Sequence, residues 1–269
     1  MKRFLKWTAS IFTAKNEAPS RHLLPETPFY AIGDIHGRYD LLQTLLARIA
    51  VENSGGKIVC VGDYVDRGEQ SLEVLNLLFS HANKTNSSLH CLIGNHEEMM
   101  LSFLESPEIH GPRWLRNGGL QTLASFGIRG VSQSTTGQDL VVARDTMRGL
   151  MGGAMETWLR SLPAHWLSGN IAVVHAGVDP ELPISLQQLK HLLWGHPKFL
   201  NTQRSDDIWV VHGHTIVPEP TFQNGRIAID TGAYATGRLT AAYIAQDEVR
   251  FLTTWPTERR PNKLLTSEQ

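Results

Sequence analysis

Features of secreted and membrane proteins are scarce in this 269-residue sequence. Only two cysteines occur, Cys60 and Cys91, and each lies in an apolar run, so two buried, reduced thiols are expected rather than a disulfide. No apolar run approaches the roughly 18–20 residues that cross a membrane. The sequence therefore predicts a globular protein of a reducing compartment, and we expect a cytoplasmic location.

An excess of charge of either sign is also missing. The chain has 25 basic and 26 acidic residues, a formal net charge of −1. No global field therefore attracts nucleic acid or an anionic membrane, so electrostatic specificity must be local and no nucleic-acid partner is expected. Hydrophobic residues make up 41% of the chain, which is enough for a sizeable core.

The two ends differ from the middle. Residues 1–28 form a basic, mildly amphipathic arm and a proline-containing linker, and residues 257–269 form a polar tail. No signal-peptide cleavage site is evident in the arm. The arm is either a loosely ordered extension or, through residues 1–15, a helix lying on a membrane surface or a partner. One domain is expected at 29–256.

Strands alternate with helices in this domain, which predicts an α/β fold with largely parallel pairing. Strands are expected at 29–34, 57–63, 88–95, 170–177 and 207–215, and helices at 38–50, 69–82, 97–105, 154–162 and 185–195. Residues 106–150 interrupt this rhythm and are predicted to be an inserted, cap-like segment. The last apolar pieces, near the end of the domain, suggest a hairpin-rich second sheet.

Five of the apolar runs end in residue types that bind metals. In α/β sheets, ligand sites gather at the carboxyl ends of strands, and the candidates there recur about one βαβ unit apart. They are Asp34, His36, Asp63, Asn95, His175 and either His212 or His214. Taken singly, each motif has an ordinary structural explanation. Asp34 and His36 could lie in a polar turn, Asn95 could begin a helix, and His175 or His212 could be a buried core histidine. Five in succession favour a metal site.

The residue types define the metal chemistry. Oxygen and imidazole ligands without thiolate suit Mn²⁺, Fe or Zn²⁺. Two such ions about 3.5–4 Å apart need a bridging carboxylate, and Asp63 is central in the series. Such a pair activates a bridging water at neutral pH and stabilises both oxygens of an in-line displacement.

The motifs GDIHG, GDYVDRG, GNHE, HAG and HGHT occur in this order, and over roughly residues 29–254 the chain resembles the phosphoprotein phosphatase family of binuclear metallophosphoesterases. The resemblance implies two facing mixed β-sheets flanked by helices, a four-layer sandwich. It also implies two divalent metal ions, for which Mn²⁺ is the first expectation. The resemblance implies that Asp34 and His36 bind one ion, that Asp63 bridges both, and that Asn95, His175 and His214 bind the other.

The resemblance further implies a general acid, His96, held by Asp66, and a phosphate-binding arginine, Arg67. Chemistry supports these roles. Hydrolysis of a phosphomonoester expels an alkoxide that needs a proton, and a histidine beside a carboxylate is a suitable acid near pH 7. The developing charge on the phosphoryl oxygens favours a planar, bidentate arginine.

A second phosphate-binding arginine is less easily placed. Relatives often carry it in a W-x-R stretch after the HAG motif, but this chain reads WGHPKF, with His196 at that place. His196, Arg116, Arg144 and Arg238 are therefore alternative candidates. Asn117, beside Arg116 in the WLRNGG stretch that resembles bacterial members, is a further substrate-binding candidate.

The predicted reaction is hydrolysis of phosphoserine and phosphothreonine in a phosphoprotein or phosphopeptide partner. The alternative is a symmetrical diadenosine-polyphosphate hydrolase, but those enzymes usually lack the second aspartate of GDxxDRG and carry GNHD, whereas this chain has Asp66 and Glu97. A non-catalytic scaffold would be expected to have lost a ligand. A nuclease would be expected to carry a second histidine in place of Ile216 after GHT.

Overall fold

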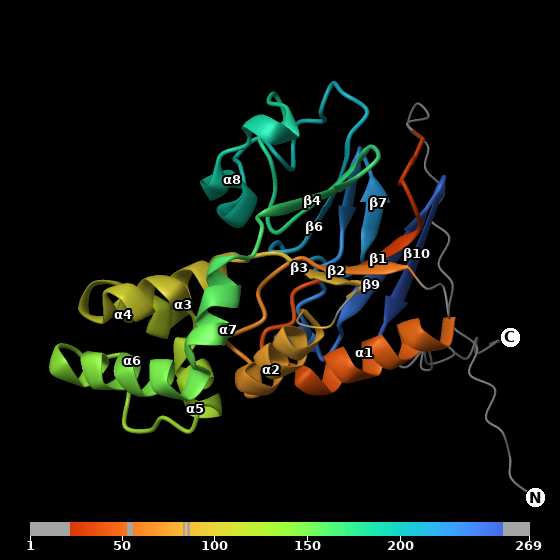
Figure 1. Cartoon of the computed structure of the whole chain (residues 1–269). Coiled ribbons are helices and arrows are strands. Elements are labelled where there is room, and N and C mark those ends of the chain that lie inside the picture. Colours follow the sequence, from red (N-terminus) through yellow and green to blue (C-terminus); the bar gives the residue numbers. More distant parts are fainter. Residues whose placement is uncertain (1–21, 53–55, 83, 85–86, 255–269) are drawn as a thin grey trace, which may run out of the picture.

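The computed structural model describes residues 22–52, 56–82, 84 and 87–254. Most of the predicted arm and linker (1–28) and all of the predicted tail (257–269) lie outside these residues. Two five-stranded mixed sheets face each other and are flanked by helices (Figure 1). The predicted fold class is therefore confirmed.

The first sheet carries the first three strands of the chain side by side. Its order is β10 (Glu248–Thr253), β9 (Thr240–Ala245), β1 (Phe29–Ile32), β2 (Lys57–Cys60) and β3 (Leu89–Cys91). β1, β2 and β3 are parallel, and Ile32, Cys60 and Cys91 are successive partners at their carboxyl ends. The segments that follow these strands therefore leave the sheet at one edge, as the βαβ pattern predicted.

The second sheet contains the strands that precede the two histidine motifs. Its order is β4 (His165–Ser168), β5 (Ile171–Val174), β6 (Trp209–His212), β8 (Arg226–Ala228) and β7 (Thr221–Gln223). β5, β6 and β8 are parallel, and β4 and β7 are antiparallel edges. The expectation that the last hairpin also belongs here was wrong. β9 and β10 instead extend the first sheet, where β9 covers the otherwise open edge of β1.

Strand alternation separates the layers. In β1, Phe29 and Ala31 pack into the core between the sheets, whereas Tyr30 and Ile32 face the helices. Helices α1 (Tyr39–Glu52) and α2 (Ser71–Ala82) cover that outer face with leucines and valines. The outer face of the second sheet packs against η2 (Ile184–Leu186), α8 (Leu189–Trp194) and Phe199.

The predicted single helix at 185–195 does not form. Gln187 and Gln188 between η2 and α8 have extended backbone conformations. The Gln187 side chain accepts the Asp179 N–H and donates to the Asp179 carbonyl, at 2.7 and 2.9 Å. These tertiary hydrogen bonds override the helical pattern of the local sequence.

Residues 106–150 are largely helical rather than polar loop. With the helices before and after them, they form a lobe at one side of the sheets (Figure 1). The lobe comprises α3 (Asn95–Glu105), α4 (Pro107–Trp114), a π-helical turn η1 (Leu115–Gly119), α5 (Leu120–Ser125), α6 (Gln138–Met151) and α7 (Gly153–Arg160). Sequence analysis missed α6, although its Leu140, Ala143, Met147 and Met151 have helical spacing and are buried.

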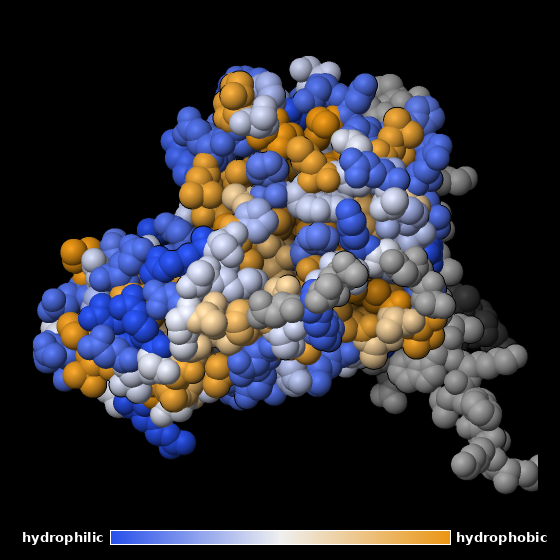
Figure 2. Space-filling view, in the orientation of Figure 1, coloured by the Kyte–Doolittle hydropathy of each residue, from blue (hydrophilic) through white to orange (hydrophobic). Residues whose placement is uncertain are grey.

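The remaining surface features are ordinary ones. On the lobe, hydrophilic residues predominate in Figure 2 with hydrophobic ones among them, and Ile109, Val142 and Leu150 are exposed.

Cys60 and Cys91 are free and buried, as expected. Across residues 22–254, apart from the short gaps, no helix has the length and apolar character needed to span a membrane.

The core between the sheets should hold the strand ends in place. We expect Ile227→Ala, at a fully buried position in β8, to lower the free energy of unfolding by about 2–5 kcal/mol, because it leaves a cavity between the sheets. Exposed Ile109→Ala is the matched control and should change it by no more than about 0.5 kcal/mol. Urea unfolding measures both. Equal effects would contradict this role of the inter-sheet core.

Candidate active site

The polar residues that follow five strands come together in the structure. Asp34 follows β1, Asp63 follows β2, and Asn95 begins α3 after β3. His175 and His214 follow β5 and β6 of the facing sheet. The site therefore lies where the carboxyl ends of the parallel strands of both sheets meet. Except for half-buried His214, these side chains are buried.

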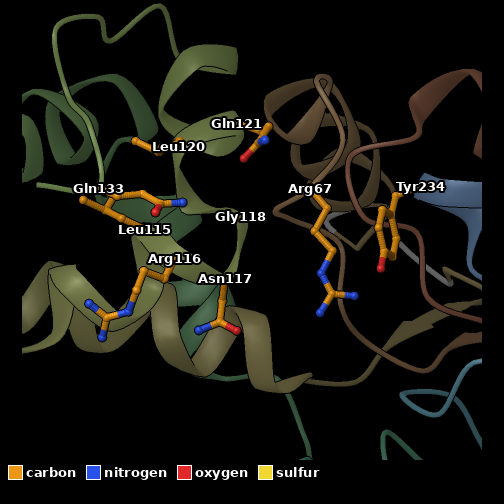
Figure 3. Close-up of a pocket in the computed structure, with 9 residues that line it drawn as sticks. All are labelled: Arg67, Leu115, Arg116, Asn117, Gly118, Leu120, Gln121, Gln133 and Tyr234. Atoms are coloured by element: carbon orange, nitrogen blue, oxygen red, sulfur yellow. The ribbon is translucent and has the colours of Figure 1, made fainter.

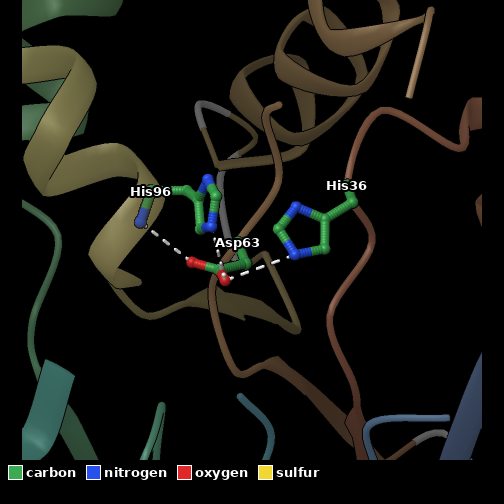
Figure 4. Close-up of side chains that lie close together, drawn as sticks. All are labelled: His36, Asp63 and His96. Carbon is green, nitrogen blue, oxygen red and sulfur yellow. Dashed lines mark hydrogen bonds and ion pairs between the residues drawn. The ribbon is translucent and has the colours of Figure 1, made fainter. Parts of the chain in front are cut away.

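The carboxylate of Asp63 lies at the centre. Its Oδ2 is 3.4 Å from His36 Nε2, and its Oδ1 is 3.3 Å from His175 Nε2 (His36 and Asp63 are shown in Figure 4). Oδ1 also accepts the backbone N–H of His96 at 3.0 Å. Although burial raises the pKa of Asp63, the imidazoles of His175, His96 and His36 lower it below the usual range. Asp63 is therefore an ionised carboxylate that both sides of the site can share.

Asn95 joins two imidazoles from the second sheet. Its Oδ1 lies 2.8 Å from His175 Nε2 and 3.0 Å from His214 Nδ1. The ligating atoms of Asp63, His175 and His214 all lie within 4.8 Å of one another. Those of His36, Asp63 and His96 do so as well. Since Asp63 belongs to both groups, it is placed to contribute to two adjacent cation positions.

Asp34 lies beside the group formed by Asp63, His175 and His214. Its carboxylate accepts the backbone N–H of His214 at 3.0 and 3.2 Å. Burial, Asp230 and Asp63 raise the pKa of Asp34 well above its usual range, and burial raises that of Asp230 to about 6. Buried carboxylates without a neighbouring positive charge are unfavourable. A bound cation would therefore stabilise the cluster of Asp34, Asp63 and Asp230.

The donor set fits divalent cations. His36 Nδ1 donates to the Val65 carbonyl at 2.8 Å, which leaves the lone pair of Nε2 toward Asp63. Burial lowers the pKa of His36 to about 3 and that of His175 to about 4, so both imidazoles are neutral and able to ligate. Asp34, His36, Asp63, Asn95, His175 and His214 are the residues that would hold such ions.

His96 differs from these imidazoles in its fixed partner. Its Nδ1 donates to Asp66 Oδ2 at 2.6 Å, and its Nε2 is 3.9 Å from Asp63, farther than His36 or His175. Burial lowers its pKa, but Asp63 and Asp66 outweigh burial, and the net shift is upward. This arrangement suits a proton donor, although His96 also belongs to the potential ligand group with His36 and Asp63 (Figure 4).

Asp66 is held by residues that sequence analysis did not single out. Trp114 Nε1 donates to its carboxylate at 3.0 Å, and Thr122 Oγ1 donates at 2.7 Å. Both come from residues 106–150. Gly118 in the same segment, with φ 110°, accepts the Arg67 N–H through its carbonyl, and a Cβ on it would lie 2.6 Å from the Arg67 nitrogen. The WLRNGG stretch thus packs directly on the loop that carries Asp66 and Arg67.

Glu97 is another residue whose role was missed. Its carboxylate accepts the backbone N–H groups of Asp63, Tyr64, Val65 and Gly94, at 2.7–3.2 Å. Burial and the charge of Asp63 raise its pKa to about 8, while the backbone hydrogen bonds oppose that shift. Glu97 therefore fixes the loop that presents Asp63. Only its place in the GNHE motif signalled it.

Arg67 lies over the ring of Tyr234, with 4.7 Å from Cζ to the ring centroid, and its Nη1 is 3.2 Å from His36 Nε2. Arg67 and Tyr234 line a cavity of about 400 Å³, and Arg116 and Asn117 line it as well (Figure 3). The Arg116 guanidinium points away from Arg67 in this view. The structure therefore places three predicted substrate-binding residues around one cavity, and it adds Tyr234.

The other candidates lie elsewhere. Arg238 donates to Pro218 and forms an ion pair with Glu219, and Arg144 donates to Leu104 and Asp145. Within the described part of the chain, neither guanidinium has a hydrogen bond or ion pair with a candidate metal ligand.

The two remaining histidines also have other partners. His212 donates to the Gly213 carbonyl and packs on Phe199, and burial lowers its pKa to about 4. His196 lies beside Asp179 and His191. The geometry thus favours His214 over His212 as a ligand, and it does not bring His196 to the phosphate-binding side.

Among solved structures, the chain superposes on a crystal structure of a candidate diadenosine tetraphosphatase, with a TM-score of 0.57, 22% identity, and 86% and 96% of the two chains covered. It also superposes on the cold-active protein-tyrosine phosphatase of a psychrophilic Shewanella species, with a TM-score of 0.53, 18% identity, and 85% and 84% covered. At these identities the likeness shows the fold alone.

Curated relatives divide between two activities. The asymmetrical bis(5'-nucleosyl)-tetraphosphatase of Oceanobacillus iheyensis is 27% identical over 81% of this chain and 88% of its own. Serine/threonine-protein phosphatase 2 of Salmonella typhimurium is 27% identical over 78% and 90%. The symmetrical bis(5'-nucleosyl)-tetraphosphatase of Pseudomonas fluorescens is 32% identical over 59% of this chain but only 45% of its own.

A family model gives the assignment. The model of the calcineurin-like phosphoesterases matches residues 27–230, which include every candidate metal ligand and the Asp66–His96 pair. The chain belongs to the calcineurin-like phosphoesterase family of metallophosphoesterases.

Proposed function

We propose that this metallophosphoesterase hydrolyses phosphoserine and phosphothreonine esters in proteins, with His96 as the general acid. The observation that carries the proposal is the buried Asp66–His96 pair, 2.6 Å apart, with Asp66 held in turn by Trp114 and Thr122. A serine or threonine leaving group departs as an alkoxide and needs a proton. A nucleotide leaving group is already a stable phosphate anion, so it needs such an acid much less.

The other residues have separable roles. Two divalent cations held by the six candidate ligands would supply the Lewis acidity that activates water. We propose Mn²⁺, with Fe and Zn²⁺ as alternatives that the same ligands accept. Arg67, supported on one face by Tyr234, would bind the phosphoryl oxygens with its N–H groups. Asp66 would keep His96 protonated before the reaction, and His96 would then give its Nε2 proton to the leaving oxygen and become neutral imidazole.

The setting is part of the proposal. A phosphoprotein or phosphopeptide would be the substrate partner, and the cavity beside Arg67, Arg116 and Asn117 would receive the residues that flank the phosphate. We also propose a cytoplasmic location, which two free, buried cysteines support because they need no oxidising compartment.

Hydrolysis of diadenosine polyphosphates is the second candidate, since two of the relatives described above are named for that activity. Direct comparison of a phosphoserine peptide with diadenosine tetraphosphate separates the two. We expect kcat/KM to favour the phosphopeptide by roughly tenfold or more. The opposite preference would replace our proposal by the nucleotide activity.

Asp63→Asn should remove the shared ligand charge. We expect kcat to fall by at least ~10³-fold, because several kcal/mol of transition-state stabilisation depend on the bound cations. Metal analysis of the purified protein should show a loss at both catalytic positions. Asp139→Asn, on the exposed surface of α6, is the control and should change neither quantity. Retention of both metals and of full activity by Asp63→Asn would contradict the assignment.

His96→Asn should separate acid catalysis from metal binding. We expect kcat on a phosphoserine peptide to fall by roughly 10²–10⁴-fold with the metal content unchanged. On p-nitrophenyl phosphate the loss should be smaller, because its leaving group needs less protonation. An equal loss on the two substrates, or loss of metal, would show that His96 is not the acid. Exposed His110→Asn controls for removal of an imidazole.

A further inference from the structure

A second cluster of potential metal ligands lies outside the candidate active site. It consists of Asp179, in the loop after β5, His191 in α8, and His196 just after α8. All three are half-buried, and their ligating atoms lie within 4.8 Å of one another. None of the three has a role in the phosphatase proposal.

The backbone builds the histidine pair. Residues five positions apart on a continuous helix point about 140° apart, so His191 and His196 would not face each other. Gly195 ends α8 with a positive φ of 82°, which glycine adopts more readily than other residues, and turns the chain back. The two imidazole centroids are consequently only 4.5 Å apart, at an interplanar angle of 76°.

Asp179 is also held in place. Gln187 binds both its backbone N–H and its carbonyl, and Arg204 Nη1 donates to the same carbonyl at 3.1 Å. Carboxylate Oδ1 accepts the Glu181 N–H at 3.0 Å. The other oxygen, Oδ2, faces Nε2 of His196 at 3.7 Å. One oxygen of a rigidly held carboxylate is thus available to a ligand.

The gap between Asp179 and His196 is too long for a hydrogen bond and only slightly wider than a shared cation requires. At 3.7 Å it exceeds the usual 2.7–3.2 Å of an N–H···O hydrogen bond. Two ligands at about 2.0–2.2 Å from one tetrahedral ion are separated by roughly 3.3–3.6 Å. The catalytic candidates show similar gaps, 3.4 Å for His36–Asp63 and 3.3 Å for His175–Asp63.

The imidazoles are largely free to ligate. His191 Nδ1 is buried and has no hydrogen-bond partner among the described residues. Burial, His196 and Lys190 lower the pKa of His191, which keeps it neutral at pH 7. His196 Nδ1 accepts a long hydrogen bond, 3.3 Å, from the Lys198 N–H. Ligation through Nε2 would place the imidazole proton on Nδ1, and this hydrogen bond would then be lost. The Lys198 ammonium is paired with Glu181 at 2.8 Å.

We propose that Asp179, His191 and His196 bind one divalent transition-metal cation, best matched by Zn²⁺, independently of the catalytic ions. Two imidazoles and a carboxylate leave one tetrahedral position for water. The site would brace α8, which carries Trp194. Trp194 donates to Glu98 at 3.2 Å, and its ring centroid is 6.4 Å from that of His214. The cation would thereby steady the wall of the catalytic site next to His214.

Zinc stoichiometry tests this proposal without using activity. Untagged, full-length Asp63→Asn chains are titrated with Zn²⁺ in competition with a chromophoric chelator. Adding His191→Gln should reduce the stoichiometry by one ion per chain, whereas adding exposed His110→Gln should not. Equal stoichiometries with and without His191→Gln would overturn the site. The same one-ion difference is expected between wild type and His191→Gln alone, which serves if Asp63→Asn impairs folding.

Co²⁺ gives a spectroscopic check on geometry. In the Asp63→Asn chain, Co²⁺ should produce the strong visible absorption of tetrahedral coordination, and adding Asp179→Ala should abolish it. Circular dichroism confirms that each variant is folded. Absorption that survives Asp179→Ala, or that never develops in the folded Asp63→Asn chain, would contradict the ligand set. Neither outcome bears on the phosphatase proposal, because the catalytic pair is already impaired in both chains.

Discussion

The buried carboxylate of Asp63 is the constraint on which the site depends. It lies within reach of His36 and His175 and close enough to Asp34 for the two charges to interact. Such a group is tolerated away from water only when imidazoles, backbone N–H groups and cations surround it. The loops that place these groups have unusual backbone conformations. Five of their residues have positive φ angles of 45–71°: His36, Asp63, Asp66, Arg67 and His214. Strain of this kind collects at functional sites.

The two sheets and the helical lobe position different residues of the candidate site. The sheets bring the potential ligands together, because parallel strands end at one edge and the two edges face each other. The lobe supplies Trp114 and Thr122, which hold Asp66 and thereby orient His96. It also supplies Arg116 and Asn117 to the cavity beside Arg67. In the proposed mechanism, metal chemistry and leaving-group chemistry are therefore supported by different parts of the chain.

This division explains how one family can contain relatives named as protein phosphatases and as dinucleoside tetraphosphatases. A phosphoryl group presents similar oxygens in both kinds of substrate, so the metal ligands need not differ. The leaving groups do differ, in basicity and in size. Under our proposal, the Asp66–His96 pair and the lining of the adjacent cavity are the places where a substrate preference would have its physical basis.

The sequence by itself determined the α/β class, the order of the ligand-bearing strands and the candidate ligands, because strand periodicity and βαβ spacing are local properties. Tertiary structure decided the rest. Trp114 and Thr122 meet Asp66 across 48 and 56 residues, and no local pattern encodes such contacts. Strand alternation alone would put His212 and His214 on one face. The resemblance favoured His214, and the packing agrees, because His214 contacts Asn95 whereas His212 donates to the Gly213 carbonyl. The turn at Gly195 likewise took His196 to Asp179 and His191, because the hydrogen bonds of Gln187 and Arg204 hold that loop in place.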